Sequence, residues 1–79
     1  YSRGMRQKLA ICRAVLHRPS VLFMDEPLTA LDTSGVRFFF DLLSIQRTRA
    51  ACLIVTHDRA PFEAVADRFV RLENGVLRE

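Results

Sequence analysis

Two short runs of apolar residues, each ended by a polar cluster, limit the possible fold most strongly. Residues 21–24 read Val-Leu-Phe-Met and residues 52–55 read Cys-Leu-Ile-Val, without the alternation of polar residues that marks a strand with one face in water. Runs of this kind are typical of strands buried on both faces, as in parallel sheets. The sequence therefore predicts two parallel strands with helices on both faces.

Helical periodicity fills the segments around these strands. Residues 5–17 carry apolar side chains at spacings of four, three and four, which predicts an amphipathic helix. A wider apolar stripe predicts a second helix over residues 33–47. Apolar residues at positions 62, 65, 66 and 69 favour a third helix, opened by residues 58–61. A hairpin is expected to follow, because Asn74-Gly75 between apolar runs favours a type I′ turn.

The order of helix, strand, helix, strand, helix and hairpin predicts an α/β fold with right-handed crossovers. The 79 residues make one small domain at most, and a lone core of that size leaves little net stability. Two parallel strands also leave long open edges. We therefore expect further polypeptide to complete the sheet.

Composition and charge exclude several classes of protein. With 49% hydrophobic and 27% charged residues, neither disorder nor a fibrous repeat is indicated. No apolar run approaches the roughly 20 residues that span a bilayer, and no signal peptide is expected at the start. Cys12 and Cys52 are expected to be free core thiols, because they and the two histidines lack the spacing of a zinc site.

Positive charge is concentrated at the start of the chain. The net charge is +3, and the first eighteen residues include no acidic residue but five basic ones, namely Arg3, Arg6, Lys8, Arg13 and Arg18. Such a segment can face phosphate or nucleic acid, or it can form a solvated helix face. Charge alone leaves these alternatives open.

Polar residues that could bind a metal ion or take part in catalysis follow both apolar runs. Asp25 and Glu26 end the first run, and Thr56, His57 and Asp58 end the second. Ligands bind beyond the carboxyl ends of strands in open α/β sheets, so the two clusters should share one edge. There an aspartate can hold Mg²⁺ beside phosphates while a glutamate takes a proton from water. Solvated acids before a proline turn are the alternative.

Four motifs, in family order, together resemble those of ABC-type ATPases. Residues 1–8 (YSRGMRQK) resemble the signature motif, residues 21–26 the Walker B strand, residues 28–32 the D-loop, and His57 the switch histidine. This resemblance identifies residues 1–79 as the C-terminal part of one ABC ATPase domain of the P-loop NTPase fold. The Walker A half is absent from the sequence.

The resemblance implies a role for each of the strand-end residues. Asp25 would coordinate Mg²⁺, and Glu26 would be the catalytic base. His57, the second catalytic residue, would contact the γ-phosphate of ATP or orient the attacking water. The alternative for His57 is a strand-end imidazole that is satisfied by a backbone carbonyl.

The resemblance also assigns nucleotide contacts to residues of the signature motif and the D-loop. Ser2, Arg3 and Gly4 would contact ATP held by a second ABC domain, and Asp32 would lie between the two domains. Ser2 and Asp32 are equally natural as helix N-caps. Tyr1, Arg3 and Met5 depart from the usual Leu-Ser-Gly-Gly-Gln, in a form similar to ATPases of haem-exporter or ABC-2 type systems.

The function implied by the resemblance is ATP hydrolysis that drives transport, with ATP and Mg²⁺ as ligands. The expected partners are a second ABC domain, arranged head to tail, and a transmembrane permease at the cytoplasmic face of the membrane. No nucleic acid is expected. The alternatives are a membrane-free ABC ATPase acting on nucleic acid or ribosomes, and a regulatory half that dimerises without hydrolysis. Without a phosphate-binding loop, the 79 residues alone are expected to be inactive.

Overall fold

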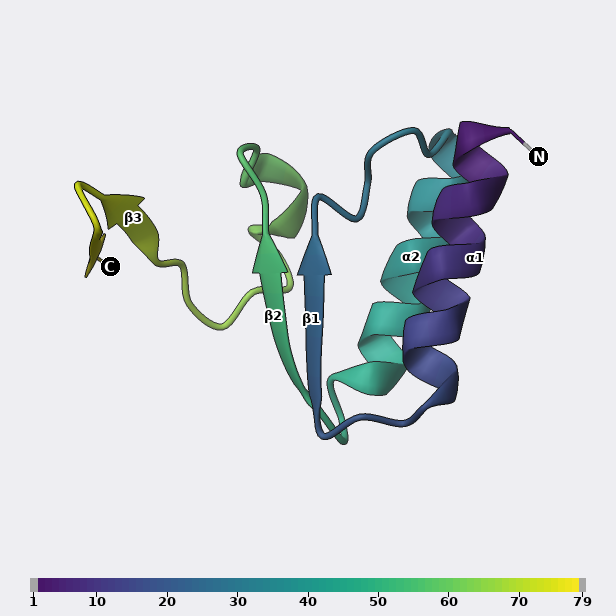
Figure 1. The fold of residues 1–79 in the computed structure, drawn as a ribbon, viewed down its shortest axis with the longest axis horizontal. Helices are drawn as coiled ribbons and strands as arrows, with labels where there is room; N and C mark the ends of the chain where they lie inside the picture. Colours follow the sequence, from purple (N-terminus) through teal and green to yellow (C-terminus); the bar gives the residue numbers. More distant parts are fainter. Residues whose placement is uncertain (1, 79) are drawn as a thin grey trace.

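The computed structural model describes residues 2–78, so Tyr1, which begins the signature-like segment, lies outside the described residues. Within this range no helix has the length and apolar character needed to cross a membrane. Figure 1 shows the elements in chain order, which are α1 (Arg3–Leu16), β1 (Val21–Asp25), α2 (Thr33–Gln46), β2 (Ala51–Val55), the 3₁₀ helix η1 (Ala60–Phe62), β3 (Arg71–Glu73) and β4 (Val76–Arg78).

Strands β1 and β2 are a parallel pair joined through α2, which confirms the predicted α/β fold. The register runs from Val21 opposite Ala51 to Asp25 opposite Val55. The two strands therefore end at the same level (Figure 1). Whatever follows them in sequence emerges at one edge of the sheet.

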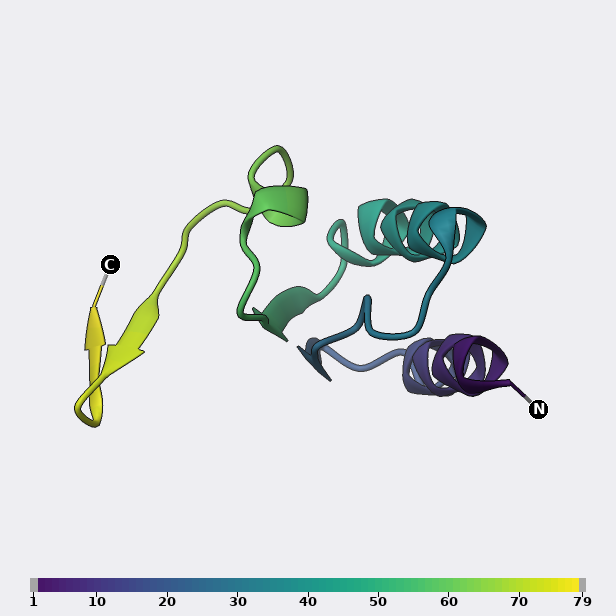
Figure 2. The same ribbon diagram turned by 90° about the horizontal axis from the view of Figure 1, so that it is seen from above.

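The core lies on one face of this strand pair. Figure 2 shows α1, α2 and η1 on the same side of β1 and β2. The Phe39 ring is 1% exposed and meets the rings of Phe40 and Phe62 at centroid distances of 5.2 and 6.2 Å. Buried hydrophobic residues come from both helices, β1 and η1, and they are Ile11, Leu22, Met24, Phe39, Leu43 and Phe62.

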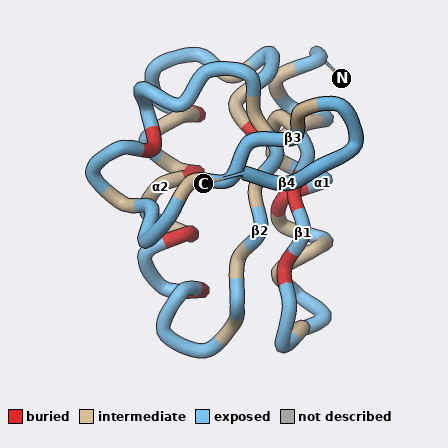
Figure 3. Tube along the Cα trace, turned by 90° about the vertical axis from the view of Figure 1, so that its left-hand side faces the viewer, coloured by how far each residue is buried: buried red, intermediate tan, exposed pale blue. Residues whose placement is uncertain are grey.

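The opposite face of the strands is open, so the prediction of strands buried on both faces is wrong for the described chain. Val21 and Phe23 are 62% and 59% exposed, and Leu53 and Val55 are 57% and 45% exposed. Figure 3 shows the alternation of buried and exposed residues along β1. The apolar runs identified strands correctly, but the two helices cover only one of their faces.

The predicted third helix is also wrong, because only the three residues of η1 are helical. The Arg47 guanidinium donates to the Val65 carbonyl at 2.7 Å, which takes an acceptor that a continuing helix would use. Phe69 leaves the helical pattern and lies under the Arg59 guanidinium, 4.2 Å from the ring centroid. Phe62 alone of the predicted stripe is buried in the core.

The C-terminal hairpin forms as predicted. Strands β3 and β4 pair antiparallel, with Arg71 opposite Arg78. Asn74 and Gly75 have φ angles of 51° and 78°, and positive values at both central residues are what a type I′ turn requires. Figures 1 and 2 show the hairpin standing away from the helices.

The two cysteines are free, as predicted, but each is only half-buried. Burial raises the pKa of the Cys52 thiol, which keeps it protonated and unreactive near neutral pH. Within residues 2–78, no three His, Cys, Asp or Glu side chains form a group that could hold a metal ion.

Phe39→Ala should lower the free energy of unfolding by about 3–5 kcal/mol, because it leaves a cavity in the centre of the core. Ile45→Ala is the matched control on the same helix, where the side chain is 57% exposed. It should cost under about 1 kcal/mol. Urea unfolding followed by circular dichroism measures both, and equal losses would contradict the placement of the core.

Candidate functional site

Glu26 turns the chain sharply away from the end of β1. Its N–H donates to the Val55 carbonyl at 2.8 Å, which adds one hydrogen bond to the parallel ladder. Its φ angle is 47°, in the left-handed region that residues with side chains seldom occupy. Conformations of this kind persist where the surrounding structure enforces them, and they cluster at functional sites.

The Glu26 carboxylate is held by the residues that follow β2. Oε1 accepts a hydrogen bond from the His57 N–H at 2.9 Å and lies 2.6 Å from His57 Nδ1. Oε2 accepts a longer bond, 3.5 Å, from the Thr56 hydroxyl. Because an ionised carboxylate only accepts, the short contact places a proton on Nδ1. The two polar clusters predicted to share an edge therefore meet there.

This contact shifts both titrations in the direction of an ion pair. The side-chain hydrogen bond from His57 lowers the pKa of Glu26, and the same hydrogen bond raises the pKa of His57. The His57 side chain is 87% exposed, so water and salt weaken the pair. Its effect is to keep Glu26 ionised and its carboxylate oriented.

Asp25 lies beside this pair, at the last position of β1, and is exposed. Within residues 2–78 no group donates a hydrogen bond to its carboxylate, in contrast to that of Glu26. Mg²⁺ in phosphate sites is usually bound by one or two carboxylates together with phosphate oxygens and water. The free carboxylate of Asp25 is a ligand of the kind that such a site requires.

Ser2 caps the N-terminus of α1. Its hydroxyl accepts a hydrogen bond from the Met5 N–H at 3.1 Å, which is the capping role that the sequence left open. The other amides of the first turn have no partner within a helix, and the helix dipole makes this end electropositive. The helix start therefore keeps the character of an anion-binding site while Ser2 caps it.

Gly4 has a packing role that the sequence analysis missed. A Cβ at this position would lie 2.9 Å from the Ala30 carbonyl oxygen, closer than carbon and oxygen tolerate. Ala30 itself has a φ angle of 66°. The absence of a side chain at Gly4 thus lets the first turn of α1 lie directly against the loop that follows β1. No periodicity in the sequence signals this contact.

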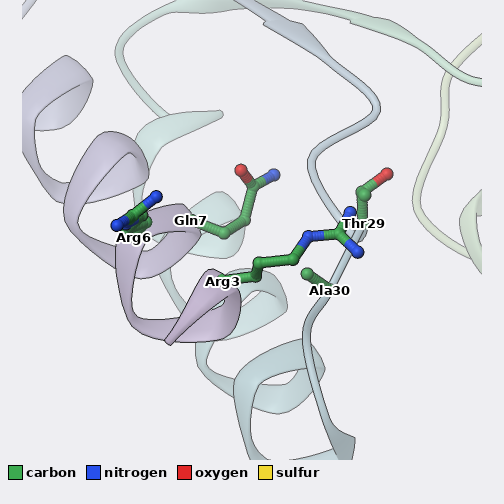
Figure 4. Close-up of a pocket in the computed structure, with 5 residues that line it drawn as sticks. All are labelled: Arg3, Arg6, Gln7, Thr29 and Ala30. Atoms are coloured by element: carbon green, nitrogen blue, oxygen red, sulfur yellow. The ribbon is translucent and has the colours of Figure 1, made fainter. Parts of the chain in front are cut away.

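Arg3 lies beside the same loop. Figure 4 shows its side chain reaching from the first turn of α1 toward Thr29 and Ala30, where an open hollow is lined also by Arg6 and Gln7. Two guanidinium groups therefore border the start of the helix. They add positive charge to a place where the helix dipole is already positive.

Asp32 acts as the N-cap of α2, the alternative that its position also suggested. Its carboxylate accepts hydrogen bonds from the Gly35 N–H at 2.8 Å and the Ser34 hydroxyl at 3.0 Å. The Gly35 bond, followed by the Ser34 bond, lowers the pKa of Asp32, and the nearby charge of Lys8 acts in the same direction. Both bonds end on the same oxygen, Oδ1.

The predicted site residues form two groups. Asp25, Glu26 and His57 gather at the strand edge, whereas Ser2, Gly4 and Asp32 line a second hollow at the start of α1 together with three further residues, Met5, Lys8 and Ala30. Gln7, which was not predicted, connects the groups. Its side-chain amide donates to the carbonyls of Glu26 at 3.2 Å and Pro27 at 2.8 Å.

Comparison with known proteins agrees with these motifs. The family model for ABC transporters matches residues 1–29. An uncharacterized ABC transporter ATP-binding protein of Bacillus subtilis, YdbJ, is 38% identical over 99% of the chain. The aliphatic sulfonates import ATP-binding protein SsuB 2 of Xanthomonas axonopodis is 46% identical over 94% of it. Over almost its whole length, the chain is therefore similar to ABC transporter ATP-binding proteins.

The chain spans about a quarter of these ABC relatives, 26% of each. It also matches the human ATP-binding cassette sub-family B member 5, at 40% identity, where it spans 6% of the protein. In each case almost the whole chain takes part in the match. The relationship therefore includes both the strand edge and the start of α1.

The Glu26–His57 pair predicts a definite pH dependence. The Glu26 pKa is lowered and the His57 pKa is raised. The pair therefore contributes fully to the free energy of unfolding between about pH 4.3 and about pH 6.5, the ordinary pKa values of the two groups. The contribution falls as the pH drops through the lowered pKa of Glu26. It also falls as the pH rises through the raised pKa of His57.

Glu26→Gln should therefore lower the pKa of His57, as measured by NMR titration of its ring protons. Asp58→Asn is the matched control, because Asp58 is the smallest contributor to the raised pKa of His57. It should shift the titration less. An unchanged His57 titration in Glu26→Gln would show that the pair does not form in solution.

Proposed function

We propose that the strand edge of this chain is the place where an ABC transporter ATPase hydrolyses ATP, and that this hydrolysis drives transport across a membrane. One observation carries the proposal: His57, which follows strand β2, lies 2.6 Å from the Glu26 carboxylate, which follows the parallel strand β1. Similarity to ABC transporter ATP-binding proteins adds the nucleotide as the expected ligand. The chemistry then follows from the residues at this edge.

Glu26 is suited to be the general base. Its carboxylate is ionised at neutral pH and remains 34% exposed, so it is within reach of a water molecule, although its lowered pKa makes it a weaker base. His57 holds one carboxylate oxygen through Nδ1 and its backbone N–H. Its other ring nitrogen, Nε2, is then available to the γ-phosphate or to the attacking water.

Asp25 would hold Mg²⁺, directly or through water. An ion held there would supply positive charge to offset the charge that develops during phosphoryl transfer. The sequence contains no Gly-x-x-x-x-Gly-Lys-Ser/Thr loop. We therefore propose that a further stretch of polypeptide, present in the longer relatives, provides the cradle for the phosphates.

The start of α1 would serve the nucleotide of a second ABC domain. Ser2, Arg3 and Gly4 form an electropositive helix end, and this end and the strand edge are separate groups of residues. A head-to-tail pair of domains would bring each helix start to the partner's phosphates. Arg3 would add a charge-assisted contact there. Closure of the pair would then act on a permease at the cytoplasmic face of the membrane.

In the full-length ATPase, Glu26→Gln should retain ATP binding and lose most of the turnover, on the order of 100-fold or more, because an amide cannot accept the proton of water. Steady-state ATPase assays and equilibrium binding of a fluorescent ATP analogue measure the two effects. Glu63→Gln, an exposed glutamate in an ion pair with Arg59 at 4.0 Å, is the control and should hydrolyse normally. Wild-type turnover in Glu26→Gln would rule out Glu26 as the base.

Ser2→Arg in the same protein should abolish ATP-dependent dimerisation and leave ATP binding by the single subunit nearly intact. The larger side chain would fill the space that the partner's phosphates enter at the helix start. Light scattering with ATP in a Glu26→Gln background follows the dimer. Ser44→Arg, an exposed serine on α2 away from this end, is the control and should dimerise normally. Normal dimerisation of Ser2→Arg would mean that Ser2 is a helix cap only.

A further inference from the structure

Gln7 joins the signature helix to the backbone of the proposed catalytic base. It lies in the second turn of α1 and is half-buried, so its amide is partly shielded from water. Nε2 donates to the Glu26 carbonyl at 3.2 Å and to the Pro27 carbonyl at 2.8 Å. Both hydrogens of one amide group are therefore directed at the turn that places Glu26.

The backbone of Glu26 is fixed from three directions. Its N–H donates to the Val55 carbonyl of β2, and its carbonyl also accepts from the Thr29 N–H at 3.1 Å. Gln7 supplies the third restraint, and it alone comes from α1. These restraints hold Glu26 at a φ angle of 47°, which an unrestrained residue with a side chain would leave.

The first turn of α1 reinforces this link. Gly4 lies against the Ala30 carbonyl, where a Cβ would come within 2.9 Å. Gly4 and Gln7 are three residues apart and so lie on one face of the helix. The start of α1 and residues 26–30 therefore contact one another at two successive turns, and a displacement of one is transmitted to the other.

We propose that Gln7 is a positioning residue that couples the start of α1 to Glu26. This inference rests on the function proposed above, in which the start of α1 contacts the partner's nucleotide while Glu26 serves its own. When the helix start moves onto the partner's phosphates, Gln7 carries that movement to the backbone of Glu26. Binding at one nucleotide site thereby aligns the base at the other.

The two carbonyl acceptors define what the side chain has to provide. Gln7→Lys retains N–H donors, Gln7→Met fills similar space without any donor, and Gln7→Glu places acceptor oxygens against two carbonyl oxygens. Turnover should fall in that order. A side chain that only filled space would instead give the same result in Gln7→Met and Gln7→Lys.

The test uses the full-length ATPase and measures kcat, KM for ATP, the Hill coefficient and the melting temperature. Gln7→Met should lower kcat about tenfold, the equivalent of roughly one hydrogen bond, with KM within about twofold. Its Hill coefficient should approach one, and Gln7→Lys should restore both kcat and the Hill coefficient in part. Arg13→Met, an exposed position on the same helix, is the control. Losses in Gln7→Met that merely follow its melting temperature would overturn the proposal.

A second measurement separates this inference from the proposed function. If Gln7 acts through Glu26, Gln7→Met should reduce turnover further by less than about twofold in a Glu26→Gln background, compared with tenfold in the wild type. An equal loss in both backgrounds would overturn the coupling and leave the role of Glu26 intact. Wild-type turnover in Glu26→Gln itself would instead remove the proposed function.

Discussion

The hydrogen bond from the Glu26 N–H to the Val55 carbonyl is the constraint on which the site depends. It closes the parallel ladder with Asp25 opposite Val55, so the residues that follow both strands begin at the same level. Only in this register does Glu26 lie next to His57. A slip of one residue would move every side chain of the strand to its other face and would separate the pair. The chemistry of the edge is thus a consequence of strand register.

Local patterns predicted most of the elements, whereas contacts between distant segments decided the rest. The parallel strands, both long helices and the type I′ hairpin follow from apolar periodicity and from Asn74-Gly75. The third helix is replaced by the short η1, followed by a contact that the sequence does not signal, the bond from the Arg47 guanidinium to the Val65 carbonyl. Apolar runs cannot show which segments cover each face, so the open side of β1 and β2 was beyond sequence reasoning.

The same distinction holds within the site. The meeting of Glu26 and His57 was predictable, because parallel strands place their carboxyl ends at one edge. The role of Gln7 was not, since its partners are backbone carbonyls 19 and 20 residues away. A backbone acceptor cannot be recognised from the sequence, because every residue has a carbonyl. Gly4 is similar, because the glycine is visible in the sequence but the carbonyl beside it is not.

Charge at the start of α1 is arranged against the stability of the isolated helix. The first turn has no acidic residue, although acids there favour the dipole, and it carries Arg3 and Arg6 instead. Cations at a positive helix end repel the dipole unless an anion is present. Each such residue destabilises the free helix by about 0.3–1 kcal/mol at low salt. A phosphate at this end would attract both the guanidinium groups and the positive end of the dipole, so the same residues that weaken the free helix would strengthen its contact with a phosphate.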